Sequence, residues 1–267
     1  MKTRNPHSWK GYVIGLTFLG IIGLGFLIIT QDTSTVNKHE YKVQLDDVTL
    51  KRLLDPFVSN HQVKTFYGID VSHWNGNVLQ DVGKEDSLSF AICKATEGVD
   101  FVDPDFRMNW NLIGEKKWIR GAYHFYEFGV DPLFQARHFW ETIEDLGRTD
   151  IAPILDVEQM SLPGNETVPL AKLQVDLLLF LDALELHFDR TPIIYTDLDF
   201  ANTYLSNPLF AHYDLWLGEY SKAIEPQIPK TWVNKGYKIW QKTAHYNIES
   251  NYVDFDVFTG RKEQLCE

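Results

Sequence analysis

Hydrophobic and polar positions divide the chain into three parts. Residues 11–30 are an apolar run without a charged side chain, and residues 31–64 are polar and mixed. From residue 65, short apolar runs alternate with segments of helical periodicity. The polar part favours a short helix at 45–54 and is interpreted as a stalk without chemistry. The alternating part predicts one folded domain over residues 65–262.

The apolar run predicts a transmembrane signal-anchor over residues 11–30. Twenty residues at about 1.5 Å each span roughly 30 Å, the hydrocarbon thickness of a bilayer. Lys2, Arg4 and Lys10 precede the run, so the positive-inside rule keeps residues 1–10 in the cytoplasm. A cleaved signal peptide is the alternative, although the run is long and no A-x-A-like site follows it. We expect a single-pass protein of the inner (cytoplasmic) membrane whose C-terminal domain lies in the periplasm or cell wall.

Strands and helices alternate through the folded domain. A parallel sheet covered by helices follows from this alternation. Seven or eight strands in about 195 residues indicate an α/β barrel of the TIM-like (β/α) type, smaller than the ordinary one. The last units have little helix, so we expect an irregular barrel there. The predicted strands cover residues 67–71, 88–95, 119–125, 151–157, 192–196, 213–217 and 237–241, and the predicted helices 104–117, 132–146 and 169–188.

Charge and composition restrict the partners. The formal net charge is −12, and the first 30 residues contain three basic side chains and no acidic one, so the remainder carries −15. Such a surface argues against nucleic acid as a partner. Aromatic residues make up 14%, with 8 Trp, which fits either a large core or stacking on sugar rings. Cys93 and Cys266 form no CxxC motif, so no zinc site is expected, and nothing supports a bridge between them.

Acidic and aromatic side chains follow the predicted strands. Functional residues of such a barrel gather at the carboxyl ends of its strands, so we expect these side chains to converge on one mouth. The aromatic residues are candidates for sugar platforms, with a core role as the alternative. The candidates are Asp70, Glu97, Tyr123, Phe125, Asp156, Glu158, Tyr195, Trp216, Tyr220, Trp240 and Asp254.

Asp156 and Glu158 form the pair best suited to chemistry. Residues two apart on a strand face the same side, with Cα atoms roughly 6.5–7 Å apart. Two carboxylates this close raise the pKa of at least one of them. A protonated carboxylic acid beside an ionised one is what glycosidic cleavage requires. The alternative is a polar pair that caps the next loop, but the position at a strand end inside an acid-rich mouth favours catalysis.

Other polar side chains have supporting roles in this interpretation. Asp70 and Asp254 come from the first and last strands, which are neighbours in a closed barrel, and either orient substrate, tune the pair or serve as structural residues. Glu97 either binds sugar hydroxyls or pairs with the nearby Lys94. His73 and His124 are expected to be hydrogen-bonded structural residues.

Eight stretches in order resemble the glycoside hydrolase family 25 lysozymes over residues 66–260. They are GIDVSHWNG (68–76), FAICKATEG (90–98), RGAYHFY (120–126), PILDVE (153–158), PIIYT (192–196), LWLGEY (215–220), IWQ (239–241) and VDFDVFTG (253–260). Three residues depart from the usual pattern of the family, namely Asn75, Lys242 and Asp256. At position 256 the family commonly has Asn.

The resemblance implies a flattened β/α barrel that hydrolyses the β-1,4 bond between N-acetylmuramic acid and N-acetylglucosamine in peptidoglycan. It implies Glu158 as proton donor and Asp156 as nucleophile or as the group that orients a substrate acetamide. Asp70 and Asp254 match the two other acids of the family's mouth, and no metal or organic cofactor is implied. A non-catalytic glycan-binding module and a hydrolase of another amino-sugar polymer, such as chitin, are the alternatives. The sequence leaves the oligomeric state open.

Overall fold

A computed structural model describes residues 63–83, 87–164, 168–249 and 251–267. The predicted transmembrane segment, the stalk and the short helix at 45–54 lie outside these residues. Within the described ranges, no helix is both long enough and apolar enough to cross a membrane.

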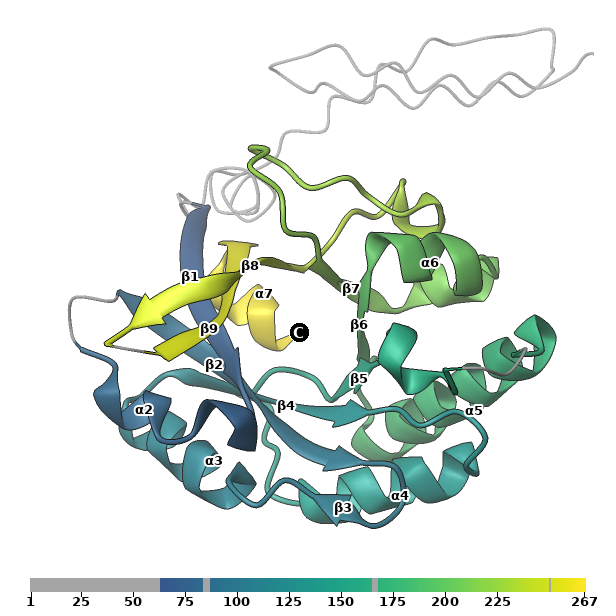
Figure 1. Cartoon of the computed structure of the whole chain (residues 1–267), viewed down its shortest axis with the longest axis horizontal. Helices are drawn as coiled ribbons and strands as arrows, with labels where there is room; N and C mark the ends of the chain where they lie inside the picture. The colour runs from purple at the N-terminus through teal and green to yellow at the C-terminus, as the bar shows by residue number, and fades with distance from the viewer. Residues whose placement is uncertain (1–62, 84–86, 165–167, 250) are drawn as a thin grey trace, which may run out of the picture. The chain divides into compact units, whose positions relative to one another are not determined.

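Eight strands of the described chain close into a barrel (Figure 1). Their order is β1-β9-β8-β7-β6-β5-β4-β2, and parallel pairing of β1 with β2 closes the ring. The α/β barrel predicted from the alternation of elements is therefore confirmed. The strands are β1 (Lys64–Val71), β2 (Leu88–Glu97), β4 (Ile119–Phe125), β5 (Ile154–Asp156), β6 (Ile193–Asp197), β7 (Asp214–Gly218), β8 (Ile239–Ile248) and β9 (Asn251–Gly260), and the short β3 (Phe101–Val102) pairs with the end of β2.

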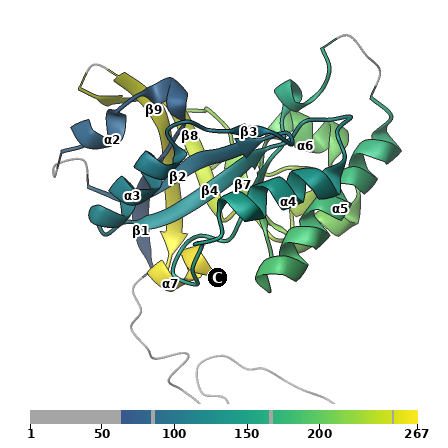
Figure 2. The ribbon, with the colours of Figure 1, turned by 90° about the horizontal axis from the view of Figure 1, so that it is seen from below.

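Most helices lie outside the ring of strands, where α3 and α4 pack against β2 (Figure 2). The C-terminal helix α7 is the exception, since its Leu265 belongs to the apolar cluster inside the barrel. The α-helices are α2 (Val78–Asp81), α3 (Phe106–Glu115), α4 (Pro132–Thr142), α5 (Leu170–Phe188), α6 (Leu198–Tyr204) and α7 (Lys262–Cys266). Short 3-10 helices are η1 (His73–Asn75), η3 (Gln159–Ser161), η4 (Pro208–His212) and η5 (Lys230–Trp232).

Strand alternation builds two apolar layers. In β2, Ala91 and Cys93 belong to the large core between sheet and helices, whereas Phe90 and Ile92 belong to a second cluster. That second cluster collects residues from six further strands and fills the barrel interior. Because successive residues of a strand face opposite sides, one short run supplies both layers.

The predicted helices at 104–117 and 132–146 each begin with a Pro preceded by an Asp, a pair typical of an N-cap and the first helical position, and these two predicted starts have different outcomes. Asp131 caps α4 by accepting hydrogen bonds from the N–H groups of Leu133 and Phe134, with Pro132 in the first turn, as predicted. The prediction for Asp103 is wrong, since α3 begins at Phe106. Asp103 instead accepts hydrogen bonds from two backbone N–H groups and from the His73 ring. An Asp-Pro pair thus marks a turn as readily as a helix cap.

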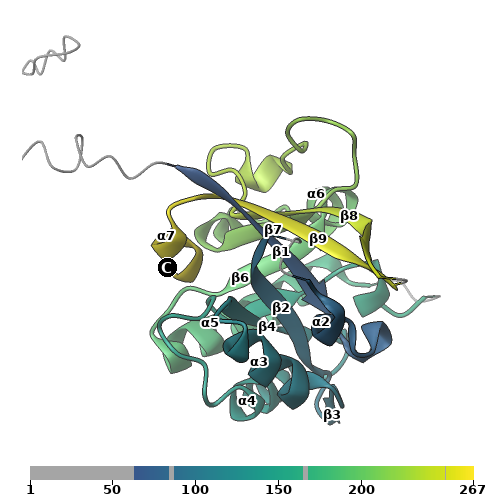
Figure 3. The same cartoon turned by 90° about the vertical axis from the view of Figure 1, so that its left-hand side faces the viewer.

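The last strand, β9, is antiparallel to its neighbours, whereas a wholly parallel sheet was predicted. β9 follows β8 through a hairpin and pairs antiparallel with both β8 and β1 (Figure 3). A hairpin needs no crossover helix, which explains the shortage of helix near the C-terminus. In this register Asp254, near the start of β9, lies opposite Asp70, near the end of β1. The prediction that these two acids sit on neighbouring strands is confirmed.

Candidate active site

The structure places the four predicted acids around one cavity of about 470 Å³ at the barrel mouth. Predicted aromatic residues and Glu97 line the same cavity. Trp240 is the exception among the candidates. The predicted residues that line it are Asp70, Glu97, Tyr123, Phe125, Asp156, Glu158, Tyr195, Trp216, Tyr220 and Asp254, and those that the candidate set lacked are Ser72, Trp74, Lys94, Met160 and Gln241.

Trp240 is placed on the other face of β8. Its side chain is only 3% exposed, and its Nε1–H donates to the backbone oxygen of Glu219 at 2.8 Å. The next residue, Gln241, lines the cavity instead. Neighbouring residues on a strand face opposite sides, so only one of the two can point into the barrel. The expectation that Trp240 lies in the mouth is therefore corrected. The alternation of side chains along β8 indicates only that one of Trp240 and Gln241 faces inward.

The aromatic residues of the cavity divide into a floor and a rim. Trp216 is 2% exposed and meets the Tyr195 ring edge-on at 4.6 Å between ring centroids. Both belong to the apolar cluster inside the barrel, so they form the floor. Tyr220 is 57% exposed and Trp74 is 83% exposed, so their rings are open to solvent at the rim. Flat exposed rings of this kind are suited to stacking against sugars.

Asp156 and Glu158 face the cavity together. Asp156 ends β5, and its buried Oδ1 atom has no hydrogen-bond partner in the described part of the chain. The Val157 side chain points away from the cavity, into the core between the strands and the helices, and the Glu158 side chain points to the cavity again. The backbone at Glu158 is extended (φ −147°), so the alternation continues past the last strand residue. This is the shared orientation that the two-residue spacing predicted.

Burial and mutual repulsion keep protons on this pair. Burial raises the pKa of Asp156 well above its usual range, and the Glu158 carboxylate raises it further. Burial likewise raises the pKa of Glu158, with contributions from the charges of Asp197 and Asp254. Lys94 opposes both shifts. The pair can therefore hold a proton at a pH where free carboxyl groups are ionised.

Among the described residues that line the cavity, Lys94 is the basic one. Its Nζ atom lies 2.6 Å from Oε2 of Glu97 and 4.8 Å from the centre of the Phe125 ring. Of the two interpretations of Glu97, pairing with Lys94 is confirmed, and the residue still lines the cavity.

Gln241 connects the acids to two phenols. Its Nε2 donates to Oδ2 of Asp70 at 2.7 Å. Its Oε1 accepts from the hydroxyls of Tyr195 and Tyr220, at 2.7 and 2.6 Å. Because both phenols donate to the amide oxygen, the amide N–H group is directed at Asp70. The Tyr220 hydroxyl also lies 3.4 Å from Oδ1 of Asp254, so one network joins the two acids.

Comparison with known proteins decides the family. Residues 69–251 match the family model described as glycosyl hydrolases family 25. The chain belongs to this family. The YegX protein of Escherichia coli K12 is 33% identical over 210 residues, covering 75% of this chain and 72% of that protein. Lysozyme M1 of Streptomyces globisporus is 29% identical over 210 residues, covering 74% and 69%.

Solved structures agree with this assignment. The bacterial lysozyme from Streptomyces coelicolor superposes with a TM-score of 0.67 at 26% identity, covering 75% of this chain and 95% of that chain. The protein is accordingly a glycosidase of family 25 with a lysozyme-like fold.

The histidines near the family 25 cavity are structural. His124 is buried between Thr96 and Gln135, and burial lowers its pKa to about 3, so the ring is neutral. His73 pairs through Nδ1 with Asp103 at 2.7 Å. Neither histidine lines the cavity among the described side chains, as expected from the sequence.

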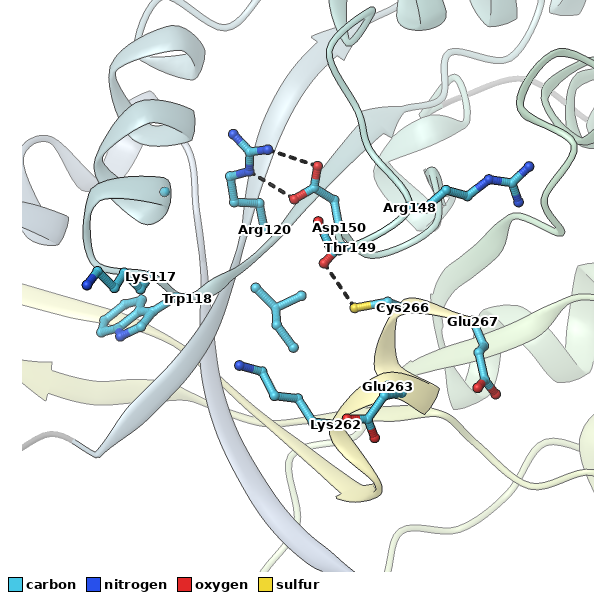
Figure 4. Close-up of a pocket in the computed structure, with 12 residues that line it drawn as sticks. Lys117, Trp118, Arg120, Arg148, Thr149, Asp150, Lys262, Glu263, Cys266 and Glu267 are labelled. Atoms are coloured by element: carbon cyan, nitrogen blue, oxygen red, sulfur yellow. Dashed lines mark hydrogen bonds and ion pairs between the residues drawn. The ribbon is translucent and has the colours of Figure 1, made fainter.

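A second cavity of about 750 Å³ lies near α7 (Figure 4). It contains the ion pair of Arg120 and Asp150, at 2.9 Å, and none of the candidate site residues. Cys266 lies here, with Sγ 3.1 Å from the backbone oxygen of Thr149. Cys93 and Cys266 are both free thiols in the structure. Among the residues described, no group of three or more His, Cys, Asp or Glu side chains is arranged to hold a metal ion.

Proposed function

We propose that this protein hydrolyses the β-1,4 bond between N-acetylmuramic acid and N-acetylglucosamine in peptidoglycan. The observation that carries the proposal is the convergence of Asp70, Asp156, Glu158 and Asp254 on one cavity in a family 25 barrel. A pure binding module has no need of two adjacent carboxyl groups with raised pKa values. Lysozyme M1 is one of the relatives, which supports this substrate class.

In the proposed reaction, Glu158 is the proton donor. It transfers its proton to the oxygen of the glycosidic bond while the bond from that oxygen to the anomeric carbon breaks. Asp156 supports the positive charge that develops at the anomeric carbon. It does so either as a nucleophile or by orienting the substrate acetamide, whose carbonyl oxygen then attacks. Water finally adds to the anomeric carbon and restores the proton to Glu158.

The cavity also offers contacts for the glycan on either side of the bond. Trp74 and Tyr220 present open rings at the rim, and Glu97 presents a half-exposed carboxylate to hydroxyl groups. Asp70 and Asp254 lie opposite each other across two paired strands. We place the scissile bond over Asp156 and Glu158, with the neighbouring sugars against the exposed rings.

Product analysis tests the substrate and the bond. We expect digestion of purified peptidoglycan to release fragments with muramic acid at the new reducing end, detected by mass spectrometry after borohydride reduction. Chitin oligomers provide the parallel substrate. New reducing ends at glucosamine, or faster cleavage of chitin, would replace this proposal by another amino-sugar hydrolase. Binding without any new reducing end would establish the glycan-binding module.

We further propose that residues 11–30 tether residues 65–262, the catalytic domain, to the outer side of the cytoplasmic membrane. The support is the length of the apolar run and the basic residues before it. The full chain expressed in a bacterium is expected in the membrane fraction after carbonate washing, with its domain accessible to protease from outside. A mature chain whose N-terminus lies beyond residue 30, found in the soluble fraction, would indicate a cleaved signal peptide instead.

A further inference from the structure

Asp256 lies directly behind the cavity and does not line it. In β9 it is two residues beyond Asp254, so both side chains point into the barrel. It pairs across the sheet with Gly68 of β1 and Gln241 of β8. Its side chain is completely buried, at 0% exposure. A buried carboxyl group needs partners that satisfy both of its oxygens.

Only one of the two oxygens has a conventional donor. Oδ1 of Asp256 accepts a hydrogen bond from Nε1–H of Trp216 at 2.8 Å. Oδ2 has no N–H or O–H partner within the described residues. The carboxyl groups of Asp256 and Asp70 lie close enough for a hydrogen bond once one of them carries a proton. Asp70 in turn receives the amide N–H of Gln241 on its Oδ2 atom.

Two buried carboxylates in contact repel each other, and a single proton between them converts that repulsion into a short, charge-assisted hydrogen bond. We propose that Asp70 and Asp256 share one proton, and that Asp256 thereby positions Asp70 at the wall of the cavity. The pair then carries one negative charge. Gln241 fixes Asp70 from one side and Asp256 fixes it from the other, while Trp216 fixes Asp256.

The surrounding groups favour retention of the shared proton. The charges of Asp254 and Asp156 act on Asp70, and that of Asp254 acts on Asp256. The phenols of Tyr123, Tyr195 and Tyr220 also face Asp70 and are neutral, because burial raises the pKa of each. The pKa values of Asp70 and Asp256 are both raised well above the usual range, with burial as the largest cause.

This inference rests on the proposed function, because it takes the cavity wall that includes Asp70 to be the surface that contacts the substrate. Asp256 is a positioning residue, since it acts through Asp70. It occupies a position where an amide would supply the same two contacts, with its oxygen toward Trp216 and its N–H toward Asp70. A carboxyl group can imitate that amide only while the shared proton is present.

Carboxyl-carbon NMR of the full chain labelled at Asp tests the shared proton directly. In the wild type we expect the Asp70 and Asp256 signals to titrate together, in two steps, with the second step well above the ordinary range of a carboxyl group. In D256N, Asp70 is expected to titrate alone, in a single step at lower pH. The inference is overturned if both wild-type signals are those of ionised carboxylates at neutral pH and shift independently of each other.

Activity separates positioning from space filling. D256N keeps both contacts, whereas D256L keeps the volume and loses them. On peptidoglycan we expect kcat of D256L to lie at least about tenfold below that of D256N, the loss of a charge-assisted contact to an active-site acid. Equal kcat values in two folded variants would show that Asp256 only fills space. Coupled NMR titration in a protein that leaves peptidoglycan intact would refute the proposed function and leave the shared proton standing.

Discussion

Replacement of Glu158 by Gln is expected to lower the rate of peptidoglycan cleavage by about 10²–10⁴-fold, the usual contribution of a positioned general acid. Glutamine keeps the shape of the side chain but has no proton to give to the departing oxygen. Because Glu158 reaches the cavity from the end of an extended segment, the substitution leaves the buried core undisturbed. The measurement is the initial rate of new reducing ends from purified peptidoglycan.

A matched substitution and a second substrate make this test specific. Glu141→Gln changes an exposed residue of α4, outside the cavity, and is expected to leave the rate as it is. An aryl glycoside with an acidic phenol as leaving group needs little protonation, so Glu158→Gln should lose far less activity on that substrate. Cleavage of peptidoglycan by Glu158→Gln at the wild-type rate would show that Glu158 is not the proton donor.

Replacement of Asp156 by Asn is expected to lower kcat by about 10²–10³-fold, comparable to removal of one group that stabilises transition-state charge. The asparagine side chain would remain in the cavity without the negative charge that supports the anomeric carbon. The pH dependence should change as well. Activity is lost as the pH rises through the upper apparent pKa of the Asp156–Glu158 pair, at which the pair loses its last proton. The Glu158 carboxylate raises the pKa of Asp156 within this pair. Without that repulsion, the alkaline limb of kcat/KM moves to lower pH.

The control for this variant is Asp189→Asn, an exposed residue with a left-handed backbone conformation (φ 50°) that Asn tolerates. Its pH profile is expected to coincide with that of the wild type. If Asp156→Asn retained both the wild-type kcat and the wild-type alkaline limb, the two carboxyl groups would not act as a pair. A limb displaced to higher pH would equally contradict the proposed electrostatics.

Local pattern was enough for much of the fold. The apolar run at 88–95 is a property of one short segment, and it predicted the strand β2. Asp131 followed by Pro132 predicted the start of α4, because a cap and its helix are neighbours in the chain. The prediction for Asp103 was wrong because its partner His73 lies thirty residues away in the chain. Local sequence pattern contains no information about such distant contacts.

Barrel closure decided the remaining positions. The candidate set included Trp240 and lacked Gln241, because the composition of a strand end does not reveal which of two adjacent residues faces inward. Asp254 reaches the mouth from the beginning of an antiparallel strand, although the rule used to select it concerns the ends of parallel ones. The prediction that Asp254 lies beside Asp70 was nevertheless correct, because the first and last strands of a closed barrel must be neighbours.

The sequence by itself determined the residue types, the order of the elements and the spacing of Asp156 and Glu158 in this family 25 glycosidase. These features depend on the pattern of residues that are close together in the chain, and this pattern is the same whatever the tertiary structure. Only the tertiary structure decided that Gln241 joins Asp70 to two tyrosines, and that Asp256 meets Asp70 beneath the cavity. Those contacts link β1, β6, β8, β9 and the segment after β7. They exist only because strand register in the closed barrel brings distant residues within hydrogen-bonding distance.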